Sequence, residues 1–226
     1  MGRRISRTVY GSPDVTTKYC YDGDQVIAEY DGSDNLLRKF VYGPGIDEPI
    51  CIIDVADSNA VYYYHFDGLG SVVALSDVNN VIVESYSYDV FGAPTIYDAN
   101  YTEISPSAIG NPYMFTARRA DDETALYYYR ARYYAFDVGR FLQTDPIGYR
   151  DGLNFYTYVR NNPTKYIDPM GTNVFGGVVS WIAGNEYDTS YSYGWSGAGQ
   201  LALGAVEGAN KGAAATADGI IPFADP

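Results

Sequence analysis

The sequence predicts an all-β protein built from short antiparallel strands, and three observations support this. Tyrosine and glycine are both abundant, at 25 and 24 of 226 residues. Tyr favours half-buried pleated strands, and Gly favours tight turns. A unit of two aromatic residues followed by Asp-x-x-Gly occurs at residues 64–70 and again, 22 positions later, at 86–92. Turn dipeptides separate the apolar runs, among them Asp31-Gly32, Asp34-Asn35, Asp67-Gly68 and Asn79-Asn80.

Each repeat unit predicts one β-hairpin of about 20 residues. The alternation places Val26, Ala28 and Tyr30 on one face of a strand, and it groups Val72, Ala74 and Ser76 in the same way. Because an isolated hairpin is marginally stable in water, neighbouring hairpins must share a buried face. The units therefore predict an array in which successive hairpins join one sheet.

The pattern changes in the second half of the chain. Residues 92–112 are poorer in pattern, and residues 100–103 and 105–107 within them predict a connecting loop. Strands are expected again at residues 112–115 and 126–134. After residue 173 aromatic residues become rarer while Gly and Ala increase, which predicts a tail with a short, weak helix around Leu201.

Composition narrows the function classes. Apolar types make up 46% of the chain, enough for a real core, and the net charge of -13 argues against a nucleic-acid partner. Two cysteines, Cys20 and Cys51, and the single histidine, His65, cannot build a Cys/His zinc cage. We therefore expect no metal or cofactor. The sequence leaves open whether the two cysteines form a disulfide, and His65 on a strand is more often a packed or surface residue than a base.

The ends of the chain carry no targeting or membrane signal that we recognise. The basic start at residues 1–4 lacks the apolar stretch of a signal peptide. The best apolar run, residues 174–184, is about half as long as a transmembrane span. We expect no transmembrane segment, and we expect the sequence to be part of a longer protein.

Residues 127–134 alternate tyrosines with arginines and allow two interpretations. The run could be a ring-stacking platform for single-stranded nucleic acid. Alternatively, Arg130 and Arg132 pair with acids or stack on rings within the fold. The structural interpretation is favoured because acids are interleaved with the basic residues, at Asp121, Asp122, Glu123, Asp137, Asp145 and Asp151.

A longer ordered series of motifs includes this run. It continues with Gly139-Arg140-Phe141, Thr144-Asp145-Pro146-Ile147-Gly148, residues 152–163 and Asp168-Pro169-Met170-Gly171. The series resembles the RHS repeat-associated core domain of bacterial polymorphic toxins and toxin-complex C components, and the upstream Tyr-Asp units resemble YD repeats. The resemblance covers residues 18–172. Besides the aspartates, it points to Arg140, Pro146, Gly148, Asn161, Asn162, Pro163, Pro169 and Gly171.

The resemblance implies a strip of antiparallel hairpins that curls into part of a hollow shell, with a C-terminal plug spiralling inward. On this basis residues 1–111 are a partial array of YD repeats and residues 112–172 are the core with its plug. Residues 173–226 are a linker or a truncated effector. The implied partners are upstream RHS repeats and a C-terminal effector, and the implied location is secreted or on the cell surface.

The resemblance also implies self-cleavage by aspartic-protease-like chemistry at Asp145 and Asp168, which stand 23 residues apart. Two carboxyl groups that lie close together cannot both ionise cheaply, so one is expected to keep its proton. The ionised group would then activate water while the protonated one polarises the scissile carbonyl. The bond at the expected position is Thr172–Asn173.

One departure bears on this expectation. The family has Leu where this chain has Thr172, and a β-branched polar residue fits an apolar subsite poorly. Asp-Pro followed by x-Gly is also an ordinary turn signal. The sequence therefore leaves open a second interpretation, a non-enzymatic structural or adhesive module on the cell surface or secreted, as in teneurins. Such a module would show no cleavage.

Overall fold

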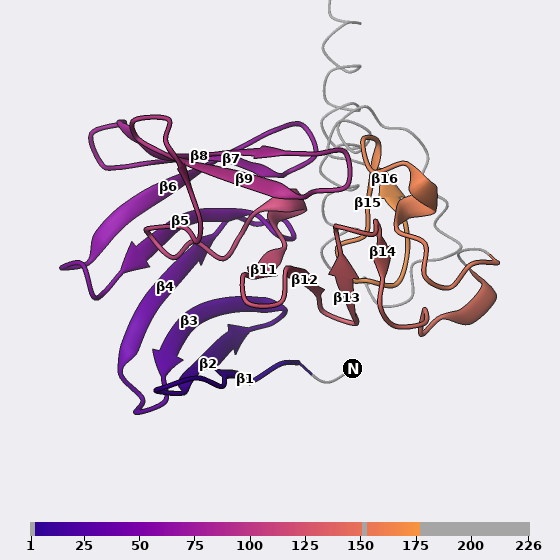
Figure 1. Cartoon of the computed structure of the whole chain (residues 1–226), viewed down its shortest axis with the longest axis horizontal. Helices are drawn as coiled ribbons and strands as arrows, with labels where there is room; N and C mark the ends of the chain where they lie inside the picture. The colour runs from indigo at the N-terminus through magenta and orange to yellow at the C-terminus, as the bar shows by residue number, and fades with distance from the viewer. Residues whose placement is uncertain (1–2, 151–152, 177–226) are drawn as a thin grey trace, which may run out of the picture. The chain divides into compact units, whose positions relative to one another are not determined.

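The computed structural model describes residues 3–150 and 153–176. The first ten strands form one sheet in chain order, and each strand is antiparallel to its neighbour (Figure 1). They are β1 (Ser6–Val9), β2 (Val15–Asp22), β3 (Gln25–Asp31), β4 (Leu36–Tyr42), β5 (Pro49–Asp54), β6 (Ala60–Phe66), β7 (Val72–Ser76), β8 (Ile82–Tyr88), β9 (Pro94–Asp98) and β10 (Glu103–Ile104). The predicted all-β strip of antiparallel hairpins is confirmed.

The later elements are shorter, and no α-helix occurs among residues 3–150 and 153–176. A four-stranded antiparallel sheet and a two-stranded one follow the ten-stranded sheet. They comprise β11 (Arg119–Asp121), β12 (Leu126–Tyr129), β13 (Arg132–Ala135), β14 (Arg140–Phe141), β15 (Tyr166–Ile167) and β16 (Phe175–Gly176). There are also three 3-10 turns in these residues: η1 (Phe115–Ala117) precedes β11, and η2 (Gly148–Arg150) and η3 (Val159–Asn161) lie between β14 and β15. The helix expected around Leu201 lies outside the described residues.

The aspartate of the repeat unit closes a hairpin loop. In five loops the Asp at the end of a strand accepts hydrogen bonds from the amides two and four residues later, at 2.8–2.9 Å. This Asx turn replaces backbone partners that the loop lacks, which explains why Asp recurs where a strand ends. The five aspartates are Asp31, Asp67, Asp77, Asp89 and Asp98.

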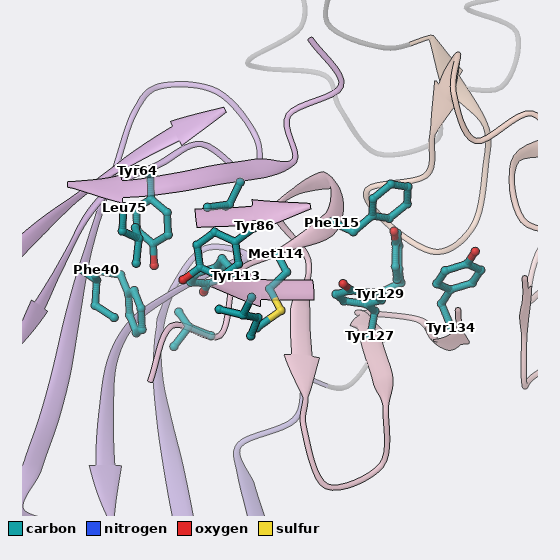
Figure 2. Packing of buried hydrophobic residues seen from close by; sticks show 14 of the residues in the cluster. Phe40, Tyr64, Leu75, Tyr86, Tyr113, Met114, Phe115, Tyr127, Tyr129 and Tyr134 are labelled. Atoms are coloured by element: carbon teal, nitrogen blue, oxygen red, sulfur yellow. The ribbon is translucent and has the colours of Figure 1, made fainter. Parts of the chain in front are cut away.

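The repeat tyrosines supply buried area with a polar tip. The hydroxyls of Tyr42 and Tyr88 donate to backbone carbonyls of neighbouring strands, at 2.9 Å and 2.6 Å. Figure 2 shows two groups of labelled core residues, one around Tyr113 and the other around Tyr129. The hydroxyl of Tyr127 donates to the Gly92 carbonyl at 2.9 Å, so the four-stranded sheet is tied to the ten-stranded one.

Bulges alter the predicted faces. Val26 and Ala28 are buried as expected, but the register shifts between Glu29 and Tyr30 and buries Glu29. In β7 the buried residues are Val72, Leu75 and Ser76, because one register shift falls between Val72 and Ala74 and a second falls between Leu75 and Ser76. A bulge adds one residue to a strand, so it reverses the face of every residue after it.

Two local predictions after residue 92 are wrong. The loop predicted at residues 100–103 and 105–107 is not one of them, because only its Glu103 lies in a strand, β10. Residues 112–115 form no strand: Tyr113 makes an isolated bridge to Arg119, and η1 follows, with Thr116 at φ +47°. The run 126–134 is a hairpin rather than one strand, because Arg130 turns at φ +54° between β12 and β13. These positive φ values fall on non-glycine residues, so the usual turn signal was missing.

Candidate functional site

The two Asp-Pro turns meet at one arginine, Arg132, the first residue of β13. Its Nη2 lies 3.1 Å from Oδ2 of Asp145 and 3.1 Å from Oδ2 of Asp168. The two carboxylate oxygens therefore lie at most about 6 Å apart, within the range where ionisable groups affect each other. The structure thus brings together the two aspartates singled out in the sequence.

The guanidinium of Arg132 is held from several directions. Its Nε donates to the Gly171 carbonyl at 2.7 Å, and its Nη1 donates to the Phe155 carbonyl at 3.1 Å. The same group lies over the ring of Phe141, 3.6 Å from the centroid. Arg132 is 2% exposed. Because every side of the guanidinium is occupied, its position relative to the two carboxylates is fixed.

The Asp145 turn has the local geometry of a repeat loop. Oδ1 of Asp145 accepts the amide of Ile147 at 2.9 Å, and its backbone carbonyl accepts the amide of Gly148 at 3.1 Å. The backbone amide of Asp145 donates to the Phe155 carbonyl at 3.1 Å. Pro146 is exposed. Oδ2 is therefore left to face Arg132.

The carboxylate of Asp168 contacts the backbone on both sides of the predicted scissile bond. Oδ1 of Asp168 accepts the amide of Thr172 at 2.9 Å and the amide of Asn173 at 3.1 Å. The second of these amides supplies the nitrogen of the Thr172–Asn173 bond. Gly171 has φ +65°, and a Cβ added there would lie 2.4 Å from the carbonyl oxygen of Tyr129. The turn therefore requires glycine for both conformation and space.

Burial raises the pKa of both carboxyl groups. The pKa of Asp168 rises to about 6 because the group is buried, although Arg132 and the amides of Thr172 and Asn173 oppose the rise. Burial also raises the pKa of Asp145, against the amide of Ile147 and Arg132. From the sequence, repulsion between the two carboxylates is the expected cause of a retained proton. The structure instead gives burial as the main cause and places a cation between them.

The other motif residues shape the surrounding chain. Arg140 is exposed on β14 and forms a backbone bridge to Thr157. Asn161 and Asn162 form the turn after the buried Tyr158, and Pro163 is buried behind it. The carbonyl of Pro169 accepts hydrogen bonds from two arginines, Arg118 and Arg130.

The two arginines of the Tyr/Arg run pair with acids inside the fold, of which Asp145 is one of the interleaved acids and Asp47 and Asp168 are not. Arg130 pairs with Asp47 and Arg132 with the two turn aspartates, while Arg132 also stacks on a ring. Arg132 is a residue of the site that the sequence motifs do not single out. The one sequence signal for Arg132 is its place in an acid-rich segment. Its contact with Asp168, 36 residues later, forms only when both turns are folded.

Comparison with known proteins places this fold among bacterial toxins. No family model matches the chain. The chain is 35% identical over 220 residues to the tRNA(Glu)-specific nuclease WapA of Bacillus subtilis subsp. natto, covering 93% of this chain and 9% of that protein. It is 32% identical over 135 residues to the toxin protein Tse5 of Pseudomonas aeruginosa, covering 60% of this chain and 10% of Tse5. The chain therefore spans about a tenth of the length of these relatives.

Solved structures agree. The crystal structure of TcdB2-TccC3 superposes with a TM-score of 0.59 at 26% identity, over 75% of this chain and 9% of that one. The TcdB2-TccC3-Cdc42 structure gives a TM-score of 0.60 at 25% identity, over 76% and 8% of the two chains. The chain belongs to the RHS-repeat, polymorphic-toxin-like family. The RHS resemblance stated from its motifs is confirmed.

Three further properties concern the described part of this RHS chain. Within residues 3–150 and 153–176, no group of His, Cys, Asp and Glu side chains could hold a metal ion. In the same residues, no helix has the length and apolar character needed to cross a membrane. Both cysteines are free thiols, with Cys20 exposed and Cys51 buried.

Proposed function

We propose that Asp145 and Asp168 form a self-cleaving site in the RHS core of this chain, and that the site hydrolyses the Thr172–Asn173 bond once, in cis. One observation carries the proposal. A carboxylate that shares Arg132 with a second carboxylate also contacts the nitrogen of the bond to be cut, at 3.1 Å. The substrate is held by its own turn, so proximity takes the place of substrate binding.

The two carboxyl groups take different roles in this proposal. Asp168, with its pKa raised to about 6, is the group that carries a proton at about pH 6 and below. Asp145 is the base that accepts a proton from water as the water oxygen attacks the carbonyl carbon of Thr172. Asp168 then gives its proton to the nitrogen of Asn173 as the C–N bond breaks. The products are a new carboxyl group at Thr172 and a new amine at Asn173.

Arg132 is the group that keeps both carboxyls in place. Its cation lowers the cost of ionising Asp145 while Asp168 remains protonated. Because its Nε donates to the carbonyl of Gly171, it also fixes the peptide immediately before Thr172. We expect its removal to disturb the geometry of the site as well as its charge.

We further infer that the ten-stranded sheet is part of an RHS shell around a C-terminal effector. The support is the sequential antiparallel sheet together with relatives whose names describe a nuclease, a toxin and toxin-complex structures. The proposed partners are further RHS repeats and that effector, and the proposed location is secreted or on the cell surface. Cleavage after Thr172 would separate the shell chain from the effector.

Intact-mass spectrometry tests the cleavage. The wild-type chain is incubated at pH 6 beside Asp145→Asn and Asp168→Asn, with Asp77→Asn as the matched control because Asp77 closes a repeat loop. We expect the wild type and the control to give two fragments that meet between Thr172 and Asn173, and both site variants to stay whole. An intact wild-type mass at all times contradicts the proposal.

One observation favours a second candidate, a non-enzymatic structural module. Every oxygen of the two carboxylates already accepts a hydrogen bond or an ion pair, as expected of a static staple between two turns. In that case no chain is cleaved. Asp168→Asn then lowers the unfolding temperature of the chain, because the mutation leaves Arg132 buried with one partner fewer.

A further inference from the structure

A second cluster of charges links the Asp168 turn to the repeat sheet. Asp47 lies in the loop between β4 and β5, and its carboxylate pairs with both Arg118 and Arg130. For Arg130 the contacts are 2.6 Å from Nη2 to Oδ1 and 3.1 Å from Nη1 to Oδ2. Both arginines also donate to the carbonyl of Pro169, from Arg118 Nη1 at 2.9 Å.

The cluster is largely out of water. The side chains of Arg118, Asp47 and Arg130 are 5%, 11% and 14% exposed. Two cations thus share one carboxylate and one carbonyl, and Asp47 is the anion that the structure gives them. Burial and the nearby Arg130 both lower the pKa of Arg118, while Asp47 raises it. A buried charge that loses its partner is strongly unfavourable, so the arrangement depends on Asp47.

Pro169 directly follows Asp168, so the cluster acts on the proposed cleavage turn itself. At one end of the turn, the carbonyl of Pro169 accepts hydrogen bonds from the guanidinium groups of Arg118 and Arg130. At the other end, Oδ1 of Asp168 holds the amides of Thr172 and Asn173. The amide of Ala131 adds a bond to the Met170 carbonyl at 3.3 Å. The turn is therefore anchored through Asp47 to a hairpin about 120 positions earlier in the sequence.

We propose that Asp47 is a positioning residue for self-cleavage, through which the docked β4–β5 hairpin aligns the turn that holds Asp168 and the scissile bond. This inference rests on the proposed function. It makes cleavage conditional on assembly, because a chain whose repeat sheet has not docked lacks the anion that holds Arg118 and Arg130 on Pro169. The bond would then be cut only after the repeat sheet has packed against the core.

The test compares Asp47→Asn, Asp47→Glu and a control, Asp34→Asn, in the full chain. Asn keeps the size of Asp47 but removes its charge, so the two buried arginines repel each other and release the carbonyl of Pro169. We expect the cleavage rate at pH 6 to fall roughly 10- to 100-fold, as for a small misplacement of reacting groups. Glu restores part of the rate because it returns the charge. The control removes only the exposed Lys18–Asp34 pair and leaves the rate unchanged.

Two further measurements separate positioning from loss of stability. If Asp47→Asn loosens the bonds from Thr172 and Asn173 to Asp168, the pKa of Asp168 rises and the pH at which cleavage stops moves upward. General destabilisation leaves that pH unchanged. Amide hydrogen exchange followed by mass spectrometry reports the same bonds without requiring cleavage. In Asp47→Asn, exchange should increase at Thr172 and Asn173 while the amides of β2–β8 keep their protection.

The outcomes distinguish this inference from the proposed function. If the wild type is cleaved and Asp47→Asn is cleaved at the same rate, the positioning role is wrong and self-cleavage stands. If no chain is cleaved, the proposed function is wrong and hydrogen exchange decides the inference. Faster exchange at Thr172 and Asn173 then supports the link from Asp47 to the turn, and unchanged exchange overturns it. If Asp47→Asn does not fold, Asp47→Glu compared with the wild type provides the same two readouts.

Discussion

Replacing Arg132 by Met removes the cation shared by Asp145 and Asp168 while keeping an unbranched side chain of similar length. The change deletes two ion pairs at 3.1 Å and two hydrogen bonds to the carbonyls of Gly171 and Phe155. Because Arg132 is 2% exposed, water cannot replace these partners without opening the core. We expect the free energy of unfolding to fall by about 3–5 kcal/mol at pH 8, the usual cost of leaving buried charges unpaired.

The loss of unfolding free energy in Arg132→Met should depend on pH, and the pKa shifts of the two carboxyl groups determine the direction of that dependence. Burial already raises the pKa of both carboxyls above their unfolded values, and removing Arg132 raises each pKa further. A carboxyl with a raised folded pKa stabilises the fold at low pH, and that stabilisation is lost as pH rises through the folded pKa. The variant should therefore be most destabilised at pH 8. Towards pH 4 the deficit should shrink by about 1.4 kcal/mol for each unit by which a pKa has risen.

The assay is urea unfolding of wild type and variant at pH 4, 6 and 8, with chain length verified by mass at each pH. Arg140→Met, on the exposed position of the neighbouring β14, is the control and should change stability by less than about 0.5 kcal/mol. A deficit for Arg132→Met that is small, or equal at all three pH values, would show that Arg132 does not carry the charge balance of the site.

The sequence was sufficient for the fold class and for the pair of aspartates, for physical reasons that can be named. The 22-residue spacing of aromatic residues and Asp reflects hairpins that add one after another to a sheet, so a local pattern determines a long-range arrangement. The positions of Asp145 and Asp168 follow from recurring motifs rather than from their surroundings. The hairpin repeat and the two Asp-Pro motifs can each be recognised within a short segment of sequence.

Other features depend on contacts between distant residues. Arg130 adopts φ +54° without being glycine and Glu29 is buried by a bulge, and neither has a signal in the adjacent sequence. The meeting of Arg132 with two turns, and of Asp47 with the Asp168 turn, requires the sheets to be docked. Local alternation cannot predict such contacts, because residues far apart in the chain determine them.

Three further predictions concern turns and protonation. Gly171→Ala should lower the free energy of unfolding by about 2–4 kcal/mol in thermal unfolding, because its Cβ would meet the Tyr129 carbonyl at positive φ. Gly148→Ala, which has open space around it, should lower it by about 1 kcal/mol. Equal losses for the two variants would contradict the close contact at Gly171. Asp77→Ala should lose about 1 kcal/mol of stability in urea, since two loop amides lose their acceptor, and no loss would refute the Asx-turn account. The wild-type cleavage rate should fall as pH rises through about 6, where Asp168 loses its proton, and a rate that increases there would exclude Asp168 as the acid.

The most direct test of the account is the position and chemistry of the cut itself. The purified wild-type chain is incubated at pH 6 in water enriched in oxygen-18, and the fragments are analysed by mass spectrometry. The account predicts an N-terminal fragment that ends at Thr172 and carries one heavy oxygen in its new carboxyl group, and a second fragment that begins at Asn173. A chain that keeps its full mass, or a cut elsewhere that survives Asp168→Asn, would contradict it.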